Sequence, residues 1–150
     1  MPEILTQHGL LSLFLLSFCA STLIPLGSEW LLISLLLGGQ DPLTSVAIAS
    51  LGNSLGAVTS YLIGIGGSCW LIEKLLRISP QQQQRAQNGF SRYGSWALLF
   101  SWLPIIGDPL CLVAGILRHS FINFVMLVAV GKTARYSLVA TLTLTGKSLL

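Results

Sequence analysis

Charged residues are scarce in this sequence: they make up only 9% of its 150 residues, whereas hydrophobic residues make up 53%. Ordinary soluble domains carry about 25% charged residues. A soluble chain of this length has too little interior to hide so much apolar surface. The composition therefore excludes an ordinary soluble domain and predicts an integral membrane protein. The net charge of +3 is too small and too dispersed to indicate a nucleic-acid partner.

Cysteine and histidine are also rare, and neither is placed for chemistry. Cys19, Cys69 and Cys111 lie in apolar stretches without CxxC spacing, so we expect packing residues and neither a disulfide nor a metal site. The two histidines, His8 and His119, have no partners at metal-ligand spacing and cannot complete a Ser-His-Asp constellation. We expect no cofactor and no enzyme activity. The start of the chain lacks a basic segment, so we also expect no cleaved signal peptide.

The apolar runs contain a repeated interruption. Pro25 is followed four residues later by Glu29, and Pro104 is followed four residues later by Asp108, so that 104 − 25 = 108 − 29 = 79. The same offset relates four further pairs: Gly52 and Gly131, Asn53 and Lys132, Gly56 and Arg135, Gly67 and Gly146. A proline and an acid in apolar surroundings are a rare combination, so their recurrence indicates an internal duplication. Coincidence is the alternative, because single glycine matches are common.

Proline and glycine predict a helix break in each copy. We expect the first break at Pro25 and Gly27, and the second at Pro104, Gly107 and Pro109. A proline has no backbone N–H and disfavours helix at the residue before it. Lipid cannot satisfy the backbone groups that a break exposes, so each break should be buried in protein or line a cavity.

The helical pieces beside the first break are too short to cross a bilayer. Residues 9–24 reach about 24 Å and residues 28–38 about 16 Å, against a hydrocarbon core of about 30 Å. We therefore predict a re-entrant helical hairpin over residues 9–38 and a second one over residues 94–117. One long kinked helix that spans the membrane with tilt is the alternative for each.

Two uninterrupted apolar runs, residues 43–66 and residues 121–146, predict full-length transmembrane helices. On the first of these helices a stripe of small residues should allow close packing against the hairpin, at Gly52, Gly56 and Ser60. The fold class we predict is thus an all-α integral membrane protein, an inverted repeat of a re-entrant hairpin plus a transmembrane helix.

A polar segment, residues 74–92, divides the repeats. Repeat one covers about 9–70 and repeat two about 94–148, within a single membrane domain over 1–150. Inside this polar segment Ser79 before Pro80 predicts a helix start and a short polar surface helix. A similar start is predicted where Asp41 precedes Pro42.

Basic residues collect on one side of the predicted membrane helices, at Lys74, Arg77, Arg85, Arg92 and Arg118. The other side carries only Glu3, Asp41 and Lys147. The positive-inside rule then places the 74–92 loop in the cytoplasm and both termini outside it. The two hairpins would enter from opposite faces, which is the inverted-repeat arrangement of transporters with broken helices.

These features resemble the DedA superfamily (the VTT or SNARE-associated Golgi protein type), and most of all its short YqaA-like branch. The resemblance runs from about Leu13 to Tyr136. The matching motifs, in order, are Pro-x-x-x-Glu at 25–29, Gly-Asn-x-x-Gly at 52–56, Tyr61, Gly64, Gly94, Pro104, Gly-Asp-Pro at 107–109, Gly115, and Gly-Lys-x-x-Arg-Tyr at 131–136.

The resemblance implies a multi-pass protein of the bacterial inner membrane in which two re-entrant loops face each other. It also implies membrane lipids as partners, because larger members act in membrane homeostasis and in the recycling of polyprenyl phosphate carriers. Those members carry arginines three residues before and three residues after the second-hairpin proline. This sequence has Ser101 and Gly107 there, so the substrate does not carry over with the fold.

Four ionisable residues are expected at membrane depth: Glu29, Asp108, Lys132 and Arg135. Unpaired, each would cost about 2.5 to 3.5 kcal/mol at a helix centre, so they must be paired or hydrated. Lys132 and Arg135 lie three residues apart on one helical face, where the two acids can meet them. Asn53 on the first span could hydrogen-bond the Glu29 tip or simply join two helices.

We interpret these five residues as a site for protons and an anionic substrate, with the bases holding a phosphate and the acids exchanging protons. The predicted function is a transporter, flippase or scramblase of anionic phospholipid or polyprenyl phosphate, coupled to protons. The alternative is a structural or assembly factor whose buried charges serve only packing. One protomer of 150 residues is small for a bulky lipid path, so the interpretation allows a homodimer.

Overall fold

The structure is a computed structural model that describes residues 2–21, 27–67, 79–103 and 106–149. Throughout these residues every regular element is helical, which confirms the all-α class. The proposed break residues Pro25 and Pro104 lie outside the described residues.

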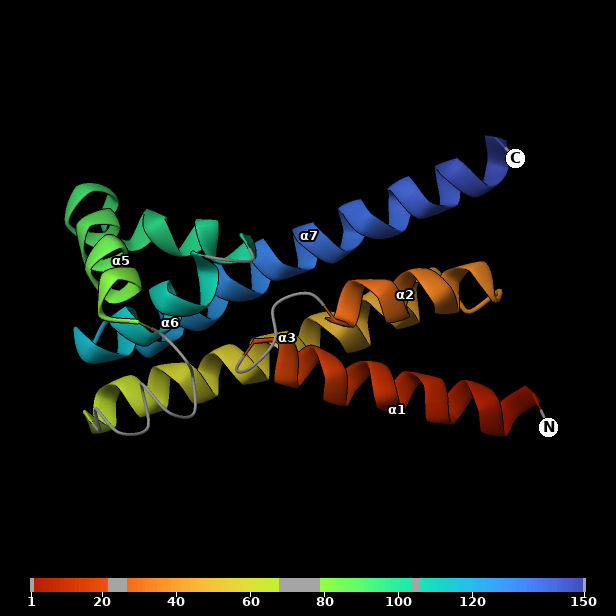
Figure 1. The fold of residues 1–150 in the computed structure, drawn as a ribbon, viewed down its shortest axis with the longest axis horizontal. Coiled ribbons are helices and arrows are strands. Elements are labelled where there is room, and N and C mark those ends of the chain that lie inside the picture. Colours follow the sequence, from red (N-terminus) through yellow and green to blue (C-terminus); the bar gives the residue numbers. More distant parts are fainter. Residues whose placement is uncertain (1, 22–26, 68–78, 104–105, 150) are drawn as a thin grey trace.

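Two long helices run the length of the molecule (Figure 1). They are α3, Pro42–Gly66, and α7, Phe121–Leu149, and both are long and apolar enough to cross a membrane. With 25 and 29 residues they reach about 37 and 43 Å. They cover the two predicted spans. The large apolar side chains of α7 face outward along much of its length, because Met126, Val130, Leu138 and Leu142 are all more than half exposed.

The predicted start of α3 is confirmed. Asp41 is its N-cap, and the carboxylate accepts hydrogen bonds from the Thr44 backbone N–H at 2.8 Å and from the Thr44 hydroxyl at 2.6 Å. Both bonds favour the ionised carboxylate and hold the pKa of Asp41 below its usual value. Pro42 follows at the first helical position, where no N–H is needed.

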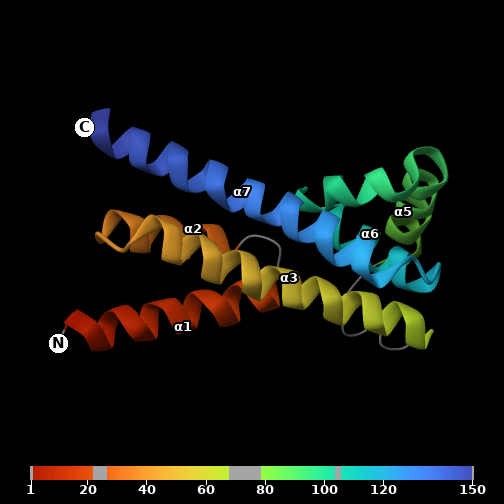
Figure 2. The same cartoon turned by 180° about the vertical axis from the view of Figure 1, so that it is seen from behind.

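The shorter helices occupy opposite halves of the molecule (Figure 1, Figure 2). α1, Pro2–Ala20, and α2, Gly27–Leu37, lie side by side in the half that holds both termini. The 3-10 helix η1, Gly94–Trp102, and α6, Gly107–Ile116, lie in the other half. α5, Pro80–Tyr93, crosses the end of that second half.

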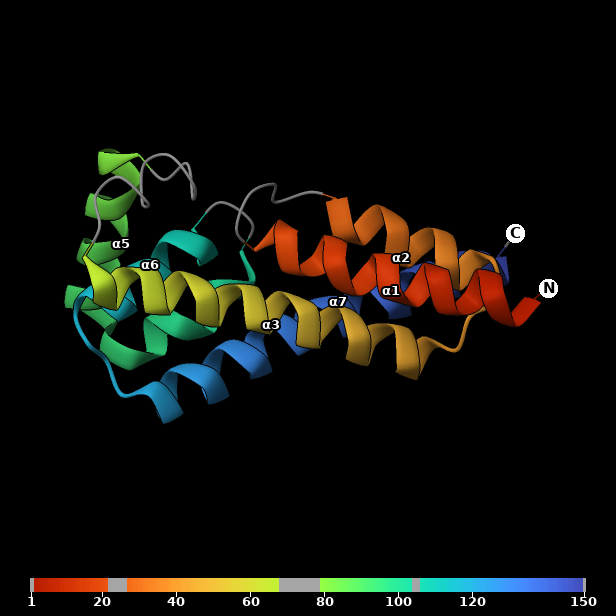
Figure 3. The same ribbon diagram turned by 90° about the horizontal axis from the view of Figure 1, so that it is seen from below.

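Each pair of short helices contacts both long helices, in a crossed pattern. α1 packs along α3 and η1 packs along α7, so the first helix of each pair contacts the long helix that follows that pair in the chain. The second helix of each pair contacts the other long helix: α6 packs on α3, and α2 packs on α7. Figure 3 shows the same division of the molecule from below. The two halves are therefore interlocked through the middle of the molecule.

Glycines on α3 make these close approaches possible. A Cβ at Gly52 would lie 2.5 Å from the Phe14 carbonyl oxygen of α1, and Gly56 makes an equally close contact one turn later. Further along, Gly64 meets Gly115 of α6, and a Cβ on either would overlap the opposite backbone. The predicted small-residue stripe thus packs against α1, and its continuation packs against α6.

The second interruption differs from the prediction at Pro109. This residue does not break a helix; it lies in the first turn of α6, where its missing N–H removes no intrahelical hydrogen bond. Gly107 begins α6, as Gly27 begins α2. The arm before the interruption, η1, is a 3-10 helix of nine residues, longer than is usual for this form.

α5 is the surface helix predicted within the polar segment. Ser79 and Gln82 form a reciprocal capping box at its start, which confirms the predicted N-cap. The helix also has a small apolar side, formed by Ala86 and Phe90, which are buried against the bundle. The run of glutamines gave no sign of this side in the sequence.

Candidate functional site

Both predicted acids lie in the first turn of a short helix. Glu29 is the third residue of α2 and Asp108 is the second residue of α6. The first-turn N–H groups have no intrahelical partner, and the helix dipole is positive there, so this position stabilises a carboxylate. Both carboxylates contact the middle part of α7, Asp108 at Lys132 and Glu29 at Arg135.

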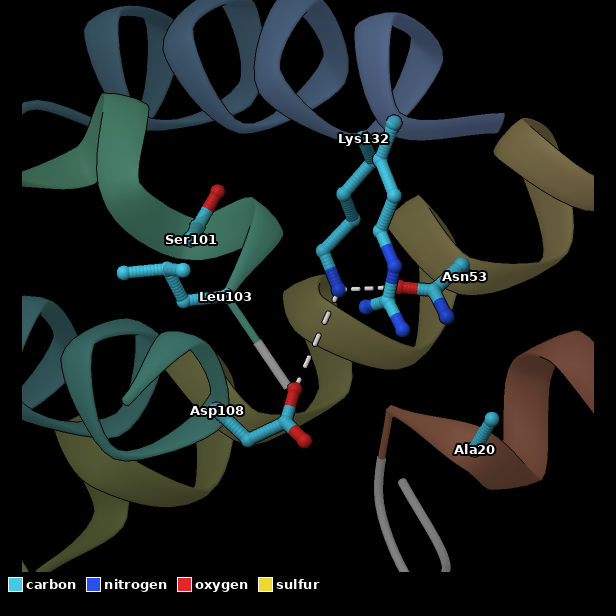
Figure 4. A pocket seen from close by; sticks show the side chains of 7 residues that line it. Ala20, Asn53, Ser101, Leu103, Asp108 and Lys132 are labelled. Atoms are coloured by element: carbon cyan, nitrogen blue, oxygen red, sulfur yellow. Dashed lines mark hydrogen bonds and ion pairs between the residues drawn. The ribbon is translucent and has the colours of Figure 1, made fainter. Parts of the chain in front are cut away.

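Lys132 of α7 is the centre of a buried polar cluster (Figure 4). It is 3% exposed, and its Nζ atom donates to Ser21 Oγ at 2.9 Å and to Asn53 Oδ1. The Nζ atom also lies 3.8 Å from Asp108 Oδ1, and Ser21 Oγ donates to the same carboxylate oxygen at 3.2 Å. The ammonium group therefore donates two hydrogen bonds and forms an ion pair with the carboxylate. Through them the end of α1 and the start of α6 meet at one atom of α7.

Arg135, one turn further along α7, forms the second ion pair, with Glu29 of α2. Its Nη1 atom also donates to the Trp102 carbonyl oxygen at the end of η1, at 3.1 Å. The Arg135 and Glu29 side chains are 16% and 21% exposed, whereas the Lys132 side chain is 4% exposed. The guanidinium group is therefore more open to the surroundings than the ammonium group.

Tyr136 joins the cluster to the tip of the first helix pair. Its hydroxyl accepts a hydrogen bond from Asn53 Nδ2 at 2.9 Å and shares a second one with Ser28 Oγ at 2.8 Å. Tyr136 is 1% exposed. Ser28 is the neighbour of Glu29, so a continuous chain of hydrogen bonds leads from the start of α2 through Asn53 to Lys132.

Tyr136, Ser21 and Ser28 were not among the site residues predicted from the sequence. A signal existed for Tyr136, since it lies four residues after Lys132 and therefore on the same helical face. No such signal marks the two serines, because small hydroxyl residues are plentiful in this chain and serve as ordinary packing residues in membrane helices.

A cavity of about 10 Å³ lies against both basic side chains, lined by Ala20, Asn53, Ser101, Leu103, Asp108, Lys132 and Arg135. Its volume suits about one water molecule. Within the described residues the buried Ser101 hydroxyl has no hydrogen-bond partner. Gly107 sits against the Ser101 backbone, and a Cβ there would overlap it. The site in this conformation is closed to anything as large as a lipid head group.

The structure brings together all five predicted site residues: Glu29, Asn53, Asp108, Lys132 and Arg135. Their role in binding or proton exchange stays a prediction. Of the predicted break residues, Gly27, Gly107 and Pro109 belong to the first turns that carry the acids. Among the described residues no group of three or more His, Cys, Asp or Glu side chains is placed to hold a metal ion.

Comparison with known proteins gives one family and several close relatives. The family model described as the VTT domain matches residues 24–144. The chain is 39% identical over 139 residues to the inner membrane protein YqaA of Escherichia coli (strain K12), covering 92% of this chain and 93% of that protein. It is 37% identical to an uncharacterized protein of Haemophilus influenzae, covering 86% of this chain and 83% of that one. No solved structure matches the chain.

Proposed function

This chain belongs to the DedA family of VTT-domain membrane proteins, and we propose that it moves anionic lipid phosphates across the bacterial inner membrane, as a flippase or scramblase coupled to protons. The inner-membrane location is inferred from its Escherichia coli relative, the inner membrane protein YqaA. The observation that carries the proposal is the pair of basic residues on α7, each held by a carboxylate from a different half of the molecule.

In this proposal α1–α2 and η1–α6 are re-entrant hairpins that enter from opposite faces of the membrane. α2 and α6 have 11 and 10 residues and reach only about 16 and 15 Å, half of a hydrocarbon core. Lys132 lies 11 residues from the start of α7, about 17 Å, which puts it near the midplane. The basic end, with α5 and Arg118, faces the cytoplasm, and both termini face the other side.

The proposed binding step is an exchange of anions. Two helix N-termini and two basic side chains converge on one place, and each of these features attracts negative charge. The carboxylates of Glu29 and Asp108 occupy it in the closed state. A lipid phosphate would take their place on Arg135, whose planar group can hold two phosphate oxygens, and then on Lys132.

Protonation provides the switch between the two anions. A proton added to Glu29 removes its charge and releases Arg135, so that the phosphate can bind there without two anions competing for one cation. Loss of the proton restores the ion pair and expels the phosphate. The direction of net movement would then follow the proton gradient. A second copy of the chain could enlarge the path for a bulky lipid.

The proposal is tested by reconstituting the full chain in liposomes with fluorescent phosphatidylglycerol and measuring its exchange between leaflets, with and without a pH gradient. We expect Arg135→Gln to slow exchange at least tenfold and Glu29→Gln to abolish its dependence on the gradient. Arg92→Gln, on the exposed side of α5, is the matched control and should behave as the wild type. Wild-type exchange in both site variants would overturn the proposal.

A second function is favoured by the closed cavity: the charges hold the hairpins in place, and the protein acts as a structural or assembly factor. The double variant Glu29→Gln/Arg135→Gln separates the two. It leaves no unpaired charge, so it should fold better than either single variant. If the ion pair is purely structural, the double variant should function normally in cells, and the wild type should show no lipid exchange. If the protein transports lipid, the double variant should be folded but inactive in lipid exchange.

A further inference from the structure

A second hollow lies between α5 and the η1–α6 pair, and it shares only Leu103 with the lining of the cavity at the ion pairs. It is a cleft of about 350 Å³, lined by Arg85, Gly89, Tyr93, Ala97, Phe100, Leu103, Ile106 and Leu110. Its floor is buried, with Ala97 and Leu110 each 2% exposed, while Tyr93 and Phe100 at its rim are 51% and 46% exposed. A packed domain rarely leaves a void of this size, and its volume lies within the range of ligand pockets.

The lining is apolar except at one place. Arg85 is the only charged residue among the residues that line the cleft, and it is exposed. The two rim aromatics lie near each other, with ring centroids 6.1 Å apart. A ligand that suits this surface has a long apolar part for the floor and a single anionic group for the guanidinium.

The position of the cleft selects between such ligands. α5 crosses the end of the molecule where α3 ends and α7 begins (Figure 1), so the cleft lies at the end of both membrane-length helices. Aromatic and basic side chains at that level face lipid head groups in a membrane. An anionic phospholipid offers both required parts at this depth.

We propose that the α5 cleft is a binding site for one anionic phospholipid, with an acyl chain over Ala97 and Leu110 and the phosphate on Arg85. This site is separate from Lys132 and Arg135, and it stands whether or not those residues move lipid. Lipid bound there fills the space between α5 and the second hairpin and fixes the helix to the rest of the molecule.

Gly89 offers a way to close the cleft without disturbing the helix. It lies in the interior of α5, and a Cβ built on it would lie 3.9 Å from Leu110 Cδ2, an ordinary van der Waals distance. A leucine side chain at this position would therefore extend into the cleft. Since glycine is a poor helix former, the substitution should not weaken α5.

The test is native mass spectrometry of the full chain in detergent, titrated with phosphatidylglycerol or phosphatidylcholine. The wild type should bind one phosphatidylglycerol at least five times more tightly than phosphatidylcholine. Gly89→Leu should weaken both at least fivefold, and Arg85→Gln should remove only the preference. Gly146→Leu, on an open surface of α7, and Arg118→Gln, at the same end of the molecule as α5, are matched controls that should bind as the wild type.

Two outcomes would overturn this inference. Unchanged lipid binding by Gly89→Leu would show that the cleft holds no acyl chain. An equal loss of preference in Arg118→Gln and Arg85→Gln would show that the anionic lipid is attracted by general positive charge instead of a site. Because Arg85 is exposed, its replacement leaves the packed core intact, so the second outcome can be read even if Gly89→Leu folds poorly.

Discussion

The two halves of the molecule build similar contacts with different residues. In the N-terminal half α1 lies so close to α3 that Gly52 nearly touches the Phe14 carbonyl oxygen. At the position 79 residues later, Gly131 of α7 faces the Leu99 carbonyl oxygen of η1, but a Cβ there would still be 3.1 Å away. The helix contact at Gly52 is therefore closer than the corresponding contact at Gly131.

The next positions along the two long helices differ in charge. α3 has Asn53 and Gly56, whereas α7 has Lys132 and Arg135 at the same offset. All the cations of the cluster thus come from one long helix, and the other long helix provides close packing. The two acids come from the starts of α2 and α6, so each of these helices is joined to α7 by an ion pair.

Asn53 and Lys132 are related by the 79-residue offset, and they hydrogen-bond to each other. Equivalent residues of two copies can meet only near the axis that relates the copies, so this contact supports the proposed internal duplication. The inverted orientation of the copies in a membrane stays a prediction. The variants below test how far the two halves are equivalent.

The largest expected effect is on the buried side of the cluster. Lys132→Met removes the buried cation but keeps much of the side-chain volume, so Asp108, whose side chain is 26% exposed, keeps its charge without its partner. We expect a loss of about 3 to 5 kcal/mol in unfolding free energy. The Arg135 side chain is more exposed than that of Lys132, so Arg135→Gln should cost only about 1 kcal/mol. Unfolding in mixed detergent micelles measures both.

The double variant Lys132→Met/Asp108→Asn is the control for this comparison. It carries no buried charge and should recover most of the lost stability. Equal stabilities for the Lys132 and Arg135 single variants would contradict the expectation that the more buried of the two cations matters more.

The two repeat-related glycines provide the next comparison. Gly52→Ala pushes a methyl group against the α1 backbone, which cannot move without shifting the helix, so we expect a loss of about 1 to 3 kcal/mol. Gly131→Ala needs a shift of only a few tenths of an ångström and should cost less. Thermal unfolding of the two variants side by side is the measurement. A larger loss for Gly131→Ala would contradict the finding that the contact between α3 and α1 is closer than the contact between α7 and η1.

Tyr136→Phe should cost about 1 to 2 kcal/mol, because it removes one hydroxyl and leaves Asn53 and Ser28 each without one buried partner. The hydrogen-bond chain from Ser28 at the start of α2 to Lys132 would then be cut while both ion pairs remain. The stability of this variant combined with Ser28→Ala provides a double-mutant cycle. Additive losses would show that the two hydroxyls do not interact.

Much of this arrangement follows from local signals in the sequence. Asp41 and Ser79 were predicted as N-caps because short polar side chains before proline satisfy free backbone N–H groups. The four charged residues of the predicted site, Glu29, Asp108, Lys132 and Arg135, were expected to lie together because charge in apolar surroundings must find a partner, and the structure pairs them. Such arguments depend only on neighbouring residues and on the cost of burying charge.

The remaining features depend on contacts between distant segments. Pro109 was predicted to break a helix, but α6 starts two residues before it and packs on α3, a distant segment that local sequence signals do not report. The role of Ser21 depends on where α1 ends relative to α6. The apolar side of α5 rests on only two residues, Ala86 and Phe90, too few to give a periodic pattern.

The most direct test of the account is which side of the membrane two turns face. In a chain without Cys19, Cys69 and Cys111, single cysteines Gln40→Cys, between α2 and α3, and Ser120→Cys, before α7, are labelled in intact cells with an impermeant maleimide. Re-entrant hairpins place these turns on opposite sides, with only Gln40→Cys labelled from outside. If each pair instead formed one kinked helix that spans the membrane once, both turns would lie on the same side and would be labelled alike. That result would contradict the account.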